Sequence, residues 1–243
     1  MFNSFIIALQ FLTRIPINVS INYSNQRLGQ SVLFYPFIGL LIGALLLALA
    51  NFLPPNNNAL NAALILSLWV AITGGLHLDG LADCSDAWAG GLGDKARTLK
   101  VMKDPAAGPI AVIYLVLVLL LKWAALQSLL DKQIYALPLL IAPLLGRLSI
   151  LMLMLTSPYV SENGLGSALL NHFPKRRAQI ITISLLLLCA WFSLWAILPY
   201  CLLILFIRHL ALQRLQGVTG DVYGASVELS ETAFIISWVL FYG

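Results

Sequence analysis

Three aspartates stand at spacings that would place them on one face of a helix. Asp79, Asp83 and Asp86 occupy positions i, i+4 and i+7 in the segment from Thr73 to Asp86. Like charges one turn apart repel each other unless a cation lies between them. Mg²⁺ prefers oxygen ligands and is commonly held by one or two carboxylates, water and the phosphate oxygens of a substrate. The segment therefore predicts magnesium-dependent phosphate chemistry, with these aspartates as metal ligands.

Basic and acidic residues alternate in the loop that follows. Lys103 and Asp104 come just before Gly108 and Pro109, where the next apolar segment begins. A lysine can contact phosphate oxygens directly, and a helix N-terminus favours an anion. Lys103 is therefore a candidate phosphate ligand and Asp104 a candidate substrate-binding residue, although a solvated loop with scattered ion pairs would look the same.

A second polar constellation lies near the C-terminus. Asp221 is bracketed by glycines, and Glu228 follows seven residues later, on the same face if the segment is helical. Asp221 is a candidate for activating a hydroxyl, and Glu228 is a candidate substrate-binding residue. A glycine-rich loop followed by an acidic first helical turn would explain the pattern equally well.

Three further residues are candidates because of their surroundings. Arg147 lies inside an apolar run, where a permanent charge is costly and needs a phosphate or carboxylate partner. His77 precedes Asp79 by two residues and could be a base, a ligand or an orienting group. Glu162 lies in a glycine-rich loop that could approach a substrate.

The chain is too apolar for an ordinary soluble domain. Of its 243 residues, 60% are hydrophobic and 10% are charged, and the mean hydropathy is +0.90. We predict an all-α, polytopic transmembrane helix bundle forming a single domain over residues 1–243, with about six spans. Apolar runs suited to crossing the bilayer are Ser31–Leu53, Ala59–Leu76, Gly108–Leu130, Ile134–Leu155, Ile180–Leu198 and the shorter Tyr200–Leu212.

Two other apolar segments are too short to span a membrane. Residues 2–12 follow the i, i+3, i+4 rule, which predicts an amphipathic helix against the bundle or the membrane surface. Residues 232–242 are apolar over about half a span, and we expect a half-length helix there.

The basic residues indicate an orientation. The formal charge is +4, but the bases are spread over short loops and form no stripe, so nucleic-acid binding is not expected. If the N-terminal segment is cytoplasmic, alternating spans place nearly all bases inside, as the positive-inside rule requires. The candidate chemistry then faces the cytoplasm.

Several motifs match one family. The chain resembles cobalamin synthase, the adenosylcobinamide-GDP ribazoletransferase family, over nearly its full length. The segments that carry the likeness are 11–16, 35–39, 73–83, 102–104, 162–166 and 219–221, together with Glu228. One departure is Ala87, since a glycine usually follows the third aspartate in that family.

The resemblance implies a multi-pass enzyme of the bacterial inner membrane that uses Mg²⁺. It would join adenosylcobinamide-GDP to α-ribazole, or to α-ribazole 5′-phosphate, and release GMP, with the ribazole 5′-hydroxyl attacking phosphorus. Its partners would be these two substrates and the lipid bilayer. Homo-oligomers and association with other enzymes of the pathway stay open.

Two alternatives stay open, another membrane enzyme and a transporter. A CDP-alcohol phosphotransferase also uses Asp-Gly-x-x-Ala motifs on membrane helices, but the Arg after Ala and the later Asp-x-x-x-Asp are missing here. A small-metabolite transporter could use intramembrane charge, but the acids cluster at one membrane face rather than at the midplane.

Overall fold

The computed structural model describes residues 1–243 except 18, 20–22, 162–168 and 170. The described residues form helices and turns, with no β-strand beyond one isolated bridge between Tyr159 and Val218. The helices are α1 (Phe2–Leu12), α2 (Asn25–Ser31), the 3₁₀ helix η1 (Val32–Phe34), α3 (Tyr35–Phe52), α4 (Asn58–Thr73), α5 (Leu76–Gly90), α6 (Lys95–Val101), α7 (Pro109–Asp131), α8 (Ala136–Thr156), α10 (Lys175–Leu215) and α11 (Gly220–Tyr242). The predicted helical bundle is confirmed.

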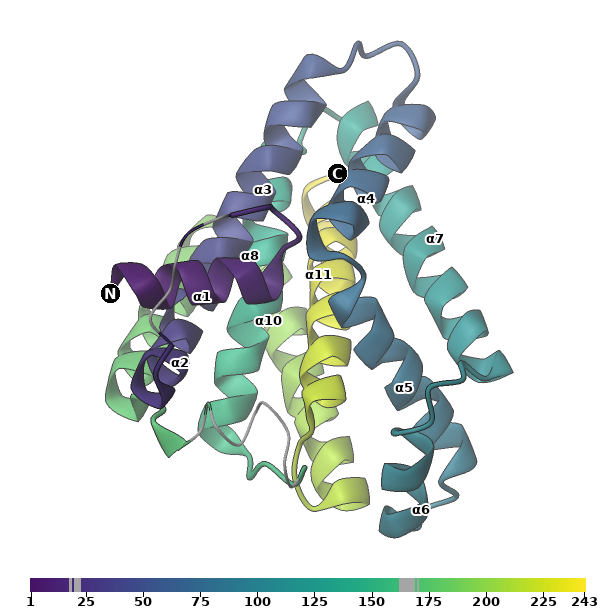
Figure 1. Cartoon of the computed structure of the whole chain (residues 1–243). Coiled ribbons are helices and arrows are strands. Elements are labelled where there is room, and N and C mark those ends of the chain that lie inside the picture. The colour runs from purple at the N-terminus through teal and green to yellow at the C-terminus, as the bar shows by residue number, and fades with distance from the viewer. Residues whose placement is uncertain (18, 20–22, 162–168, 170) are drawn as a thin grey trace.

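The number of helices able to cross a membrane agrees with the expected number of about six spans. By length and apolar composition, five helical stretches in the described ranges can span, and a sixth arises if α4 and α5 together form one bent span. Figure 1 shows α4 and α5 following one another alongside α7. The chain is therefore a multi-pass membrane protein.

Three segments differ in detail from the expected spans. The predicted span Ala59–Leu76 corresponds to the 16-residue α4, which ends at Thr73 and is long enough to span only together with α5. The predicted fifth and sixth spans belong to the 41-residue α10, in which Ser193 has non-helical backbone angles. The hydroxyl oxygen of Ser193 accepts a hydrogen bond from the Ala196 N–H (3.2 Å), so a new helical segment begins there. The C-terminal apolar stretch is the end of the 23-residue α11, which is longer than the expected half-helix because helix continues through the polar segment from Gly220.

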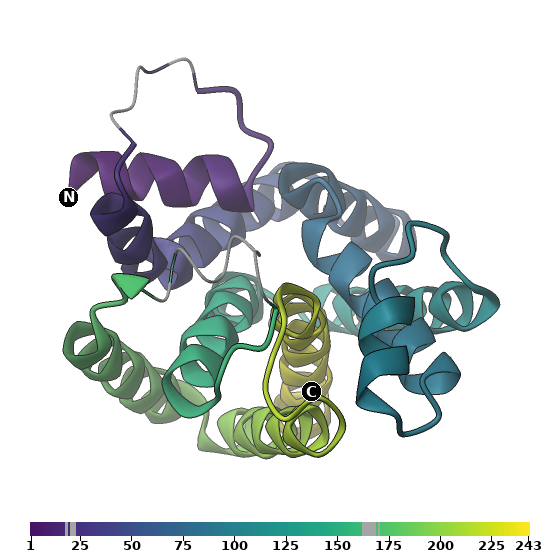
Figure 2. The same cartoon turned by 60° about the horizontal axis from the view of Figure 1, so that its bottom comes forward.

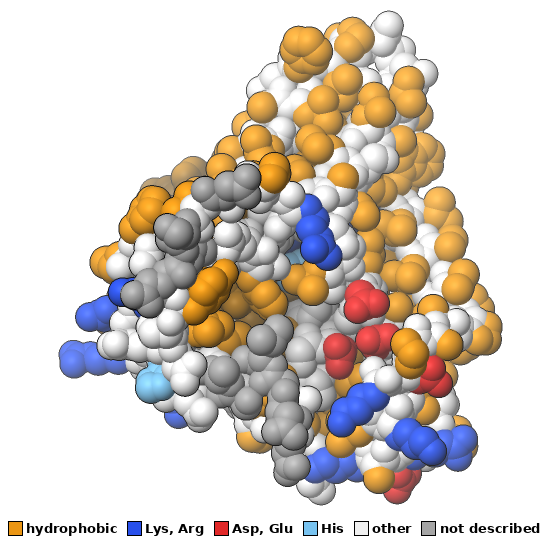
Figure 3. All heavy atoms as spheres, viewed as in Figure 1, with side chains coloured by type: hydrophobic (Ala, Val, Ile, Leu, Met, Phe, Trp, Pro, Cys, Tyr) orange, Lys and Arg blue, Asp and Glu red, His pale blue; other side chains and the backbone are white. Residues whose placement is uncertain are grey.

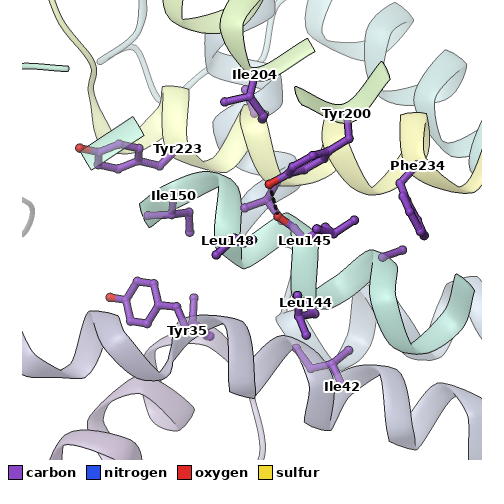
Figure 4. Close-up of a cluster of buried hydrophobic side chains, with 14 of the residues drawn as sticks. Tyr35, Ile42, Leu144, Leu145, Leu148, Ile150, Tyr200, Ile204, Tyr223 and Phe234 are labelled. Atoms are coloured by element: carbon purple, nitrogen blue, oxygen red, sulfur yellow. Dashed lines mark hydrogen bonds between the residues drawn. The ribbon is translucent and has the colours of Figure 1, made fainter. Parts of the chain in front are cut away.

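The centre of the bundle is α8, which packs against α3, α10 and α11. Gly39 and Gly43 allow the backbone of α3 to touch that of α8, since a methyl group at either position would overlap the α8 main chain around Pro143 and Leu139. Figure 4 shows the buried side chains between these helices, including Tyr200, whose hydroxyl donates to the Leu145 carbonyl (3.0 Å).

The outside of the bundle is apolar. The large hydrophobic side chains of α7 and α10 that face outward include Val112, Val116, Leu120, Leu187 and Leu202, all at least half exposed. Orange side chains cover the upper part of the molecule in Figure 3. Such a surface suits a hydrocarbon environment, where an exposed apolar side chain carries no penalty.

The predicted N-terminal helix is present as α1. It lies at the side of the bundle against α2 and α3, as Figure 2 shows. Its buried face includes Ile6, Leu9 and Leu12, whereas Phe2 and Phe11 are exposed. The alternation of faces follows the helical period of the sequence.

Candidate active site

A glycine pair turns the chain into the acidic helix. Gly74 and Gly75 have φ angles of 63° and 72°, in the left-handed region that glycine adopts without strain. They end α4 and allow α5 to start at an angle of 89° to it. Asp79 then falls in the first turn of α5, where the helix dipole favours a negative charge.

A close helix contact brings the second acidic constellation to the first. Gly80 of α5 and Gly224 of α11 face one another, and a Cβ built at Gly80 would lie 2.8 Å from the backbone oxygen of Asp221 and 3.1 Å from Cα of Gly224. Because neither glycine has a side chain, the two helices meet backbone to backbone. Asp79 and Asp221 consequently line the same cavity.

Four carboxylates gather around this contact. Asp83 lies within electrostatic range of Asp79, Asp86 and Asp221, and all three repel its charge. Figure 3 shows most of the visible red side chains gathered over α5. Among the described residues, the ion pairs that the structure gives do not include any of these four aspartates.

Asp86 differs from its neighbours because it is held by the backbone of another helix. Its carboxylate accepts hydrogen bonds from the N–H groups of Gly108 (2.5 Å) and Ala111 (2.9 Å), at the start of α7. A side chain at Gly108 would overlap this carboxylate. Asp86 therefore caps α7 and ties it to α5. Ala87, the departure from the family pattern, is fully buried in α5.

The carboxylates suit a magnesium ion in their chemistry. Among the residues that the structure describes, no group of three or more His, Cys, Asp or Glu side chains is placed to hold a metal ion together. Mg²⁺ does not require one, since it is usually bound by one or two carboxylates, waters and substrate phosphates. Asp79 and Asp221 line one cavity, and Asp83 lies within electrostatic range of both, so the type of donor, although not a preformed three-carboxylate site, fits the ion. Asp86 could bind the ion only while its carboxylate also accepts hydrogen bonds from the N–H groups of Gly108 and Ala111.

Basic side chains lie near the carboxylates of α5, in the segment around α6. Asp83, Asp86 and Asp104 line a cavity of about 370 Å³, which continues past Asp104 into a basic hollow. The basic side chains of that hollow are Arg97, Lys100 and Lys103. Asp104 also accepts a hydrogen bond from the Ala106 N–H (3.0 Å), which shapes the loop before α7. The structure thus brings Lys103 and Asp104 next to the acidic group.

Arg147 and Glu228 lie deeper, in a buried ionic network. The Arg147 guanidinium is fully buried and pairs with Glu231. Lys122 joins Glu231 (2.6 Å) to Glu228 (2.9 Å), and its ammonium lies 4.2 Å from the ring centre of Trp69. Two cations and two carboxylates therefore link α7, α8 and α11 inside the bundle. A substrate role for Arg147 or Glu228 stays a prediction.

His77 is buried beside the acidic group. Its side chain is 3% exposed, lines the same cavity as Asp79 and Asp221, and its Nε2 has no hydrogen-bond partner among the described residues. An unpaired buried polar atom is costly, so a ligand at this position would gain a hydrogen bond. Glu162, the remaining candidate, lies outside the described residues.

Two groups beyond the candidates named above lie at or near the site. Lys122 and Glu231 complete the buried network. The sequence signals for them are the position of Lys122 within an apolar run and the spacing of three residues between Glu228 and Glu231. The aromatic residues Tyr35 and Tyr223 line the cavity next to Asp79 and Asp221. No sequence spacing joins these two rings, because they come from α3 and α11.

Comparisons with known proteins give one consistent result. Residues 4–239 match the family described as cobalamin-5-phosphate synthase. Adenosylcobinamide-GDP ribazoletransferases are similar over nearly their whole length: that of Pseudomonas fluorescens Pf-5 is 48% identical, covering 98% of this chain and 99% of the relative, and that of Acinetobacter baumannii ATCC 17978 is 45% identical, covering 98% and 97%. The Pseudomonas putida KT2440 relative is 47% identical, covering 97% and 98%. No solved structure gives a significant match.

Proposed function

Because the chain belongs to the cobalamin-5-phosphate synthase family, we propose that it joins adenosylcobinamide-GDP to α-ribazole, or to α-ribazole 5′-phosphate, with release of GMP. The observation that carries the proposal is the group of Asp79, Asp83 and Asp221 between an apolar cavity and a basic hollow. Transfer from a pyrophosphate needs a metal ion, basic side chains for the phosphates and a place for the acceptor. The acidic group, the basic hollow and the cavity would provide these three side by side.

The reaction would be a single displacement at phosphorus. A ribose hydroxyl of the ribazole forms a bond to the phosphorus that carries the cobinamide, and the P–O–P bond to GMP breaks. GMP leaves with the bridging oxygen, and the hydroxyl proton passes to a base or to water. The family description names a product with a 5-phosphate. If the 5′-oxygen of the ribose carries that phosphate, it cannot also form the new bond to phosphorus. The attacking group would then be another ribose hydroxyl and not the 5′-hydroxyl that the resemblance implied.

The protein residues mainly position and neutralise charge in such a step. Asp79, Asp83 and Asp221 would hold Mg²⁺, which when bound supplies neutralisation of the phosphate charge. Lys103, in the basic hollow, would bind phosphate oxygens of the GDP group. His77 or Asp221, both at the cavity wall, would orient the attacking hydroxyl and receive its proton.

The buried network would act on the site indirectly. Glu228 and Glu231 fix α11 two to three turns from Asp221, and Arg147 and Lys122 hold them there. Arg147 reaches α11 through a carboxylate, so we assign it to positioning rather than to direct phosphate binding.

The orientation is part of the proposal. Lys95, Lys103, Lys175 and Arg214 belong to loops and helix ends near the basic hollow or at the same end of the bundle, whereas Lys132 is at the opposite end of α7. By the positive-inside rule, the acidic group would lie at the cytoplasmic side of the bacterial inner membrane.

The test is GMP release by the purified protein in lipid, with adenosylcobinamide-GDP and α-ribazole. We expect turnover that requires Mg²⁺, disappears with EDTA and is absent in Asp79→Asn. Asp131→Asn is the matched control, because this acid lies at the far end of α7 and bonds only to Asn58 (2.8 Å) among the described residues. Turnover in Asp79→Asn equal to that of the control would contradict the role of Asp79. Silence of the wild type beside an active synthase would contradict the activity itself.

A further inference from the structure

An aromatic cavity adjoins the acidic group. It has a volume of about 240 Å³, and its walls come from α1, α3, α5, α8 and α11. Two pairs of roughly parallel rings belong to it. Phe11 and Tyr35 have ring centres 6.0 Å apart with 23° between their planes, and Tyr159 and Tyr223 have centres 6.1 Å apart with 16° between their planes.

The aromatic rings frame an aliphatic wall. Figure 4 shows Ile150 between the rings of Tyr35 and Tyr223, whose hydroxyl groups point to the same side. Met154 lines the cavity one turn further along α8. A planar ring placed here would meet aromatic faces, a branched aliphatic side chain and a polarisable sulfur, all of which suit an aromatic ligand.

Two buried polar atoms in this wall have no partner among the described residues. They are Nε2 of His77 and the hydroxyl of Tyr223, and the two side chains are 3% and 8% exposed. Such atoms are costly unless a ligand or water satisfies them. Asp79 and Asp221 line the same cavity. A ligand inside it therefore has an apolar surround for a ring and polar groups for an attached sugar.

The size of the cavity limits the ligand. Sites for small molecules commonly measure about 300–1,000 Å³, so 240 Å³ admits one small ring system and excludes a corrin ring. Between the two bases of the proposed reaction, guanine carries hydrogen-bonding groups around most of its edge, and the aromatic and aliphatic side chains that form most of this wall offer them no partner. A benzimidazole presents a largely apolar edge. The basic side chains that would bind the phosphates of adenosylcobinamide-GDP lie elsewhere, in the basic hollow of Arg97, Lys100 and Lys103.

Resting on the proposed function, we propose that this aromatic cavity is the binding site for the planar benzimidazole base of the ribazole. The base lies among Phe11, Tyr35, Ile150 and Tyr223, and the ribose extends toward Asp79 and Asp221. The cavity thereby sets the choice of base, and the acidic group receives the hydroxyl that reacts.

The test compares two phenylalanines on the same helix. Phe11 lines the cavity and is 41% exposed, whereas Phe2 is 67% exposed and lies outside it, so neither substitution by leucine removes a fully buried ring. We expect Phe11→Leu to raise the KM for α-ribazole about 2- to 10-fold, the usual worth of one aromatic pair, and to leave the KM for adenosylcobinamide-GDP unchanged. Phe2→Leu is expected to match the wild type in both constants.

A second variant and a competitor make the test independent of Phe11. Tyr223→Phe keeps the ring and removes the unpartnered hydroxyl, and we expect the same selective rise in the KM for α-ribazole. Free benzimidazole is expected to compete with α-ribazole and not with adenosylcobinamide-GDP.

The outcomes separate this proposal from the reaction itself. If the wild type shows no GMP release, the proposed function fails and the cavity assignment falls with it. If the wild type is active but both variants alter only the KM for adenosylcobinamide-GDP, the cavity holds the guanine and the assignment is overturned. Active variants with both constants unchanged would overturn it as well.

Discussion

The contact between Gly80 and Gly224 gives a quantitative prediction about catalysis. A methyl group at Gly80 would lie 2.8 Å from the Asp221 backbone oxygen, whereas ordinary contact begins at 3.4 Å. The difference, 3.4 − 2.8 = 0.6 Å, must be met by separation of α5 and α11, because the obstructing atoms are main-chain atoms. Overpacking of this kind typically costs about 1–3 kcal/mol of stability.

The same separation moves Asp79 away from Asp221. Misplacement of catalytic groups by about 1 Å can lower a rate on the order of 10²-fold. We therefore expect Gly80→Ala to reduce kcat/KM for GMP release about 10- to 100-fold while the protein remains folded in lipid. The Mg²⁺ concentration needed for half-maximal rate should rise with it, since Asp79 of α5 and Asp221 of α11 would both hold the ion.

Two other glycines supply a graded control. At Gly224 the nearest atom to a new Cβ is Cα of Gly80 at 3.2 Å, so Gly224→Ala should have a smaller effect in the same direction. At Gly90, also in α5, the nearest atoms belong to the Val101 side chain at 3.5 Å, which is ordinary contact. Gly90→Ala should retain full activity. Wild-type kinetics in Gly80→Ala, with thermal stability lowered or not, would refute the argument that this contact sets the distance between the acids.

The remaining predictions concern stability. Lys122→Met leaves Arg147 as the single cation for Glu228 and Glu231, and we expect the free energy of unfolding to fall by about 3–5 kcal/mol. Adding Glu228→Gln restores the neutrality of the network and should recover part of that loss. Additive losses of the two substitutions in thermal unfolding in detergent would contradict the network. Asp86→Ala removes two hydrogen bonds from the start of α7 and should cost about 1–3 kcal/mol, checked by hydrogen exchange at Gly108 and Ala111. Gly39→Ala should prevent close packing of α3 on α8 and lower the yield of folded protein more than any other glycine substitution named above, and equal yields would count against that packing.

Local patterns in the sequence were sufficient for several features. The helical period places Asp79, Asp83 and Asp86 within one helix, and α5 contains all three. The spacing of Gly39 and Gly43 predicts a close helix contact, and both glycines touch α8. Span lengths follow from apolar composition because the thickness of the bilayer is fixed. Each of these inferences depends only on neighbours along the chain.

Helix ends were less predictable. The break within α10 lies at Ser193 and not at Pro199, where the two predicted apolar runs meet, and α11 continues through the polar segment from Gly220; packing decides both. Asp86 shows the same limit: its spacing suggested a third metal ligand, but its carboxylate caps α7, a helix that begins 23 residues later at Pro109.

The sequence alone determined that this is a multi-pass helical membrane protein with three aspartates in one helix, because hydropathy and helical period are local properties. Only the tertiary structure decided that Asp221 joins that cluster, that Lys122 and Arg147 share Glu231, and that rings from α1, α3 and α11 enclose one cavity. These residues are far apart along the chain, and their partners depend on which helix faces meet. That choice is made by packing, through contacts such as Gly80 on Gly224, and no spacing within a single segment encodes it.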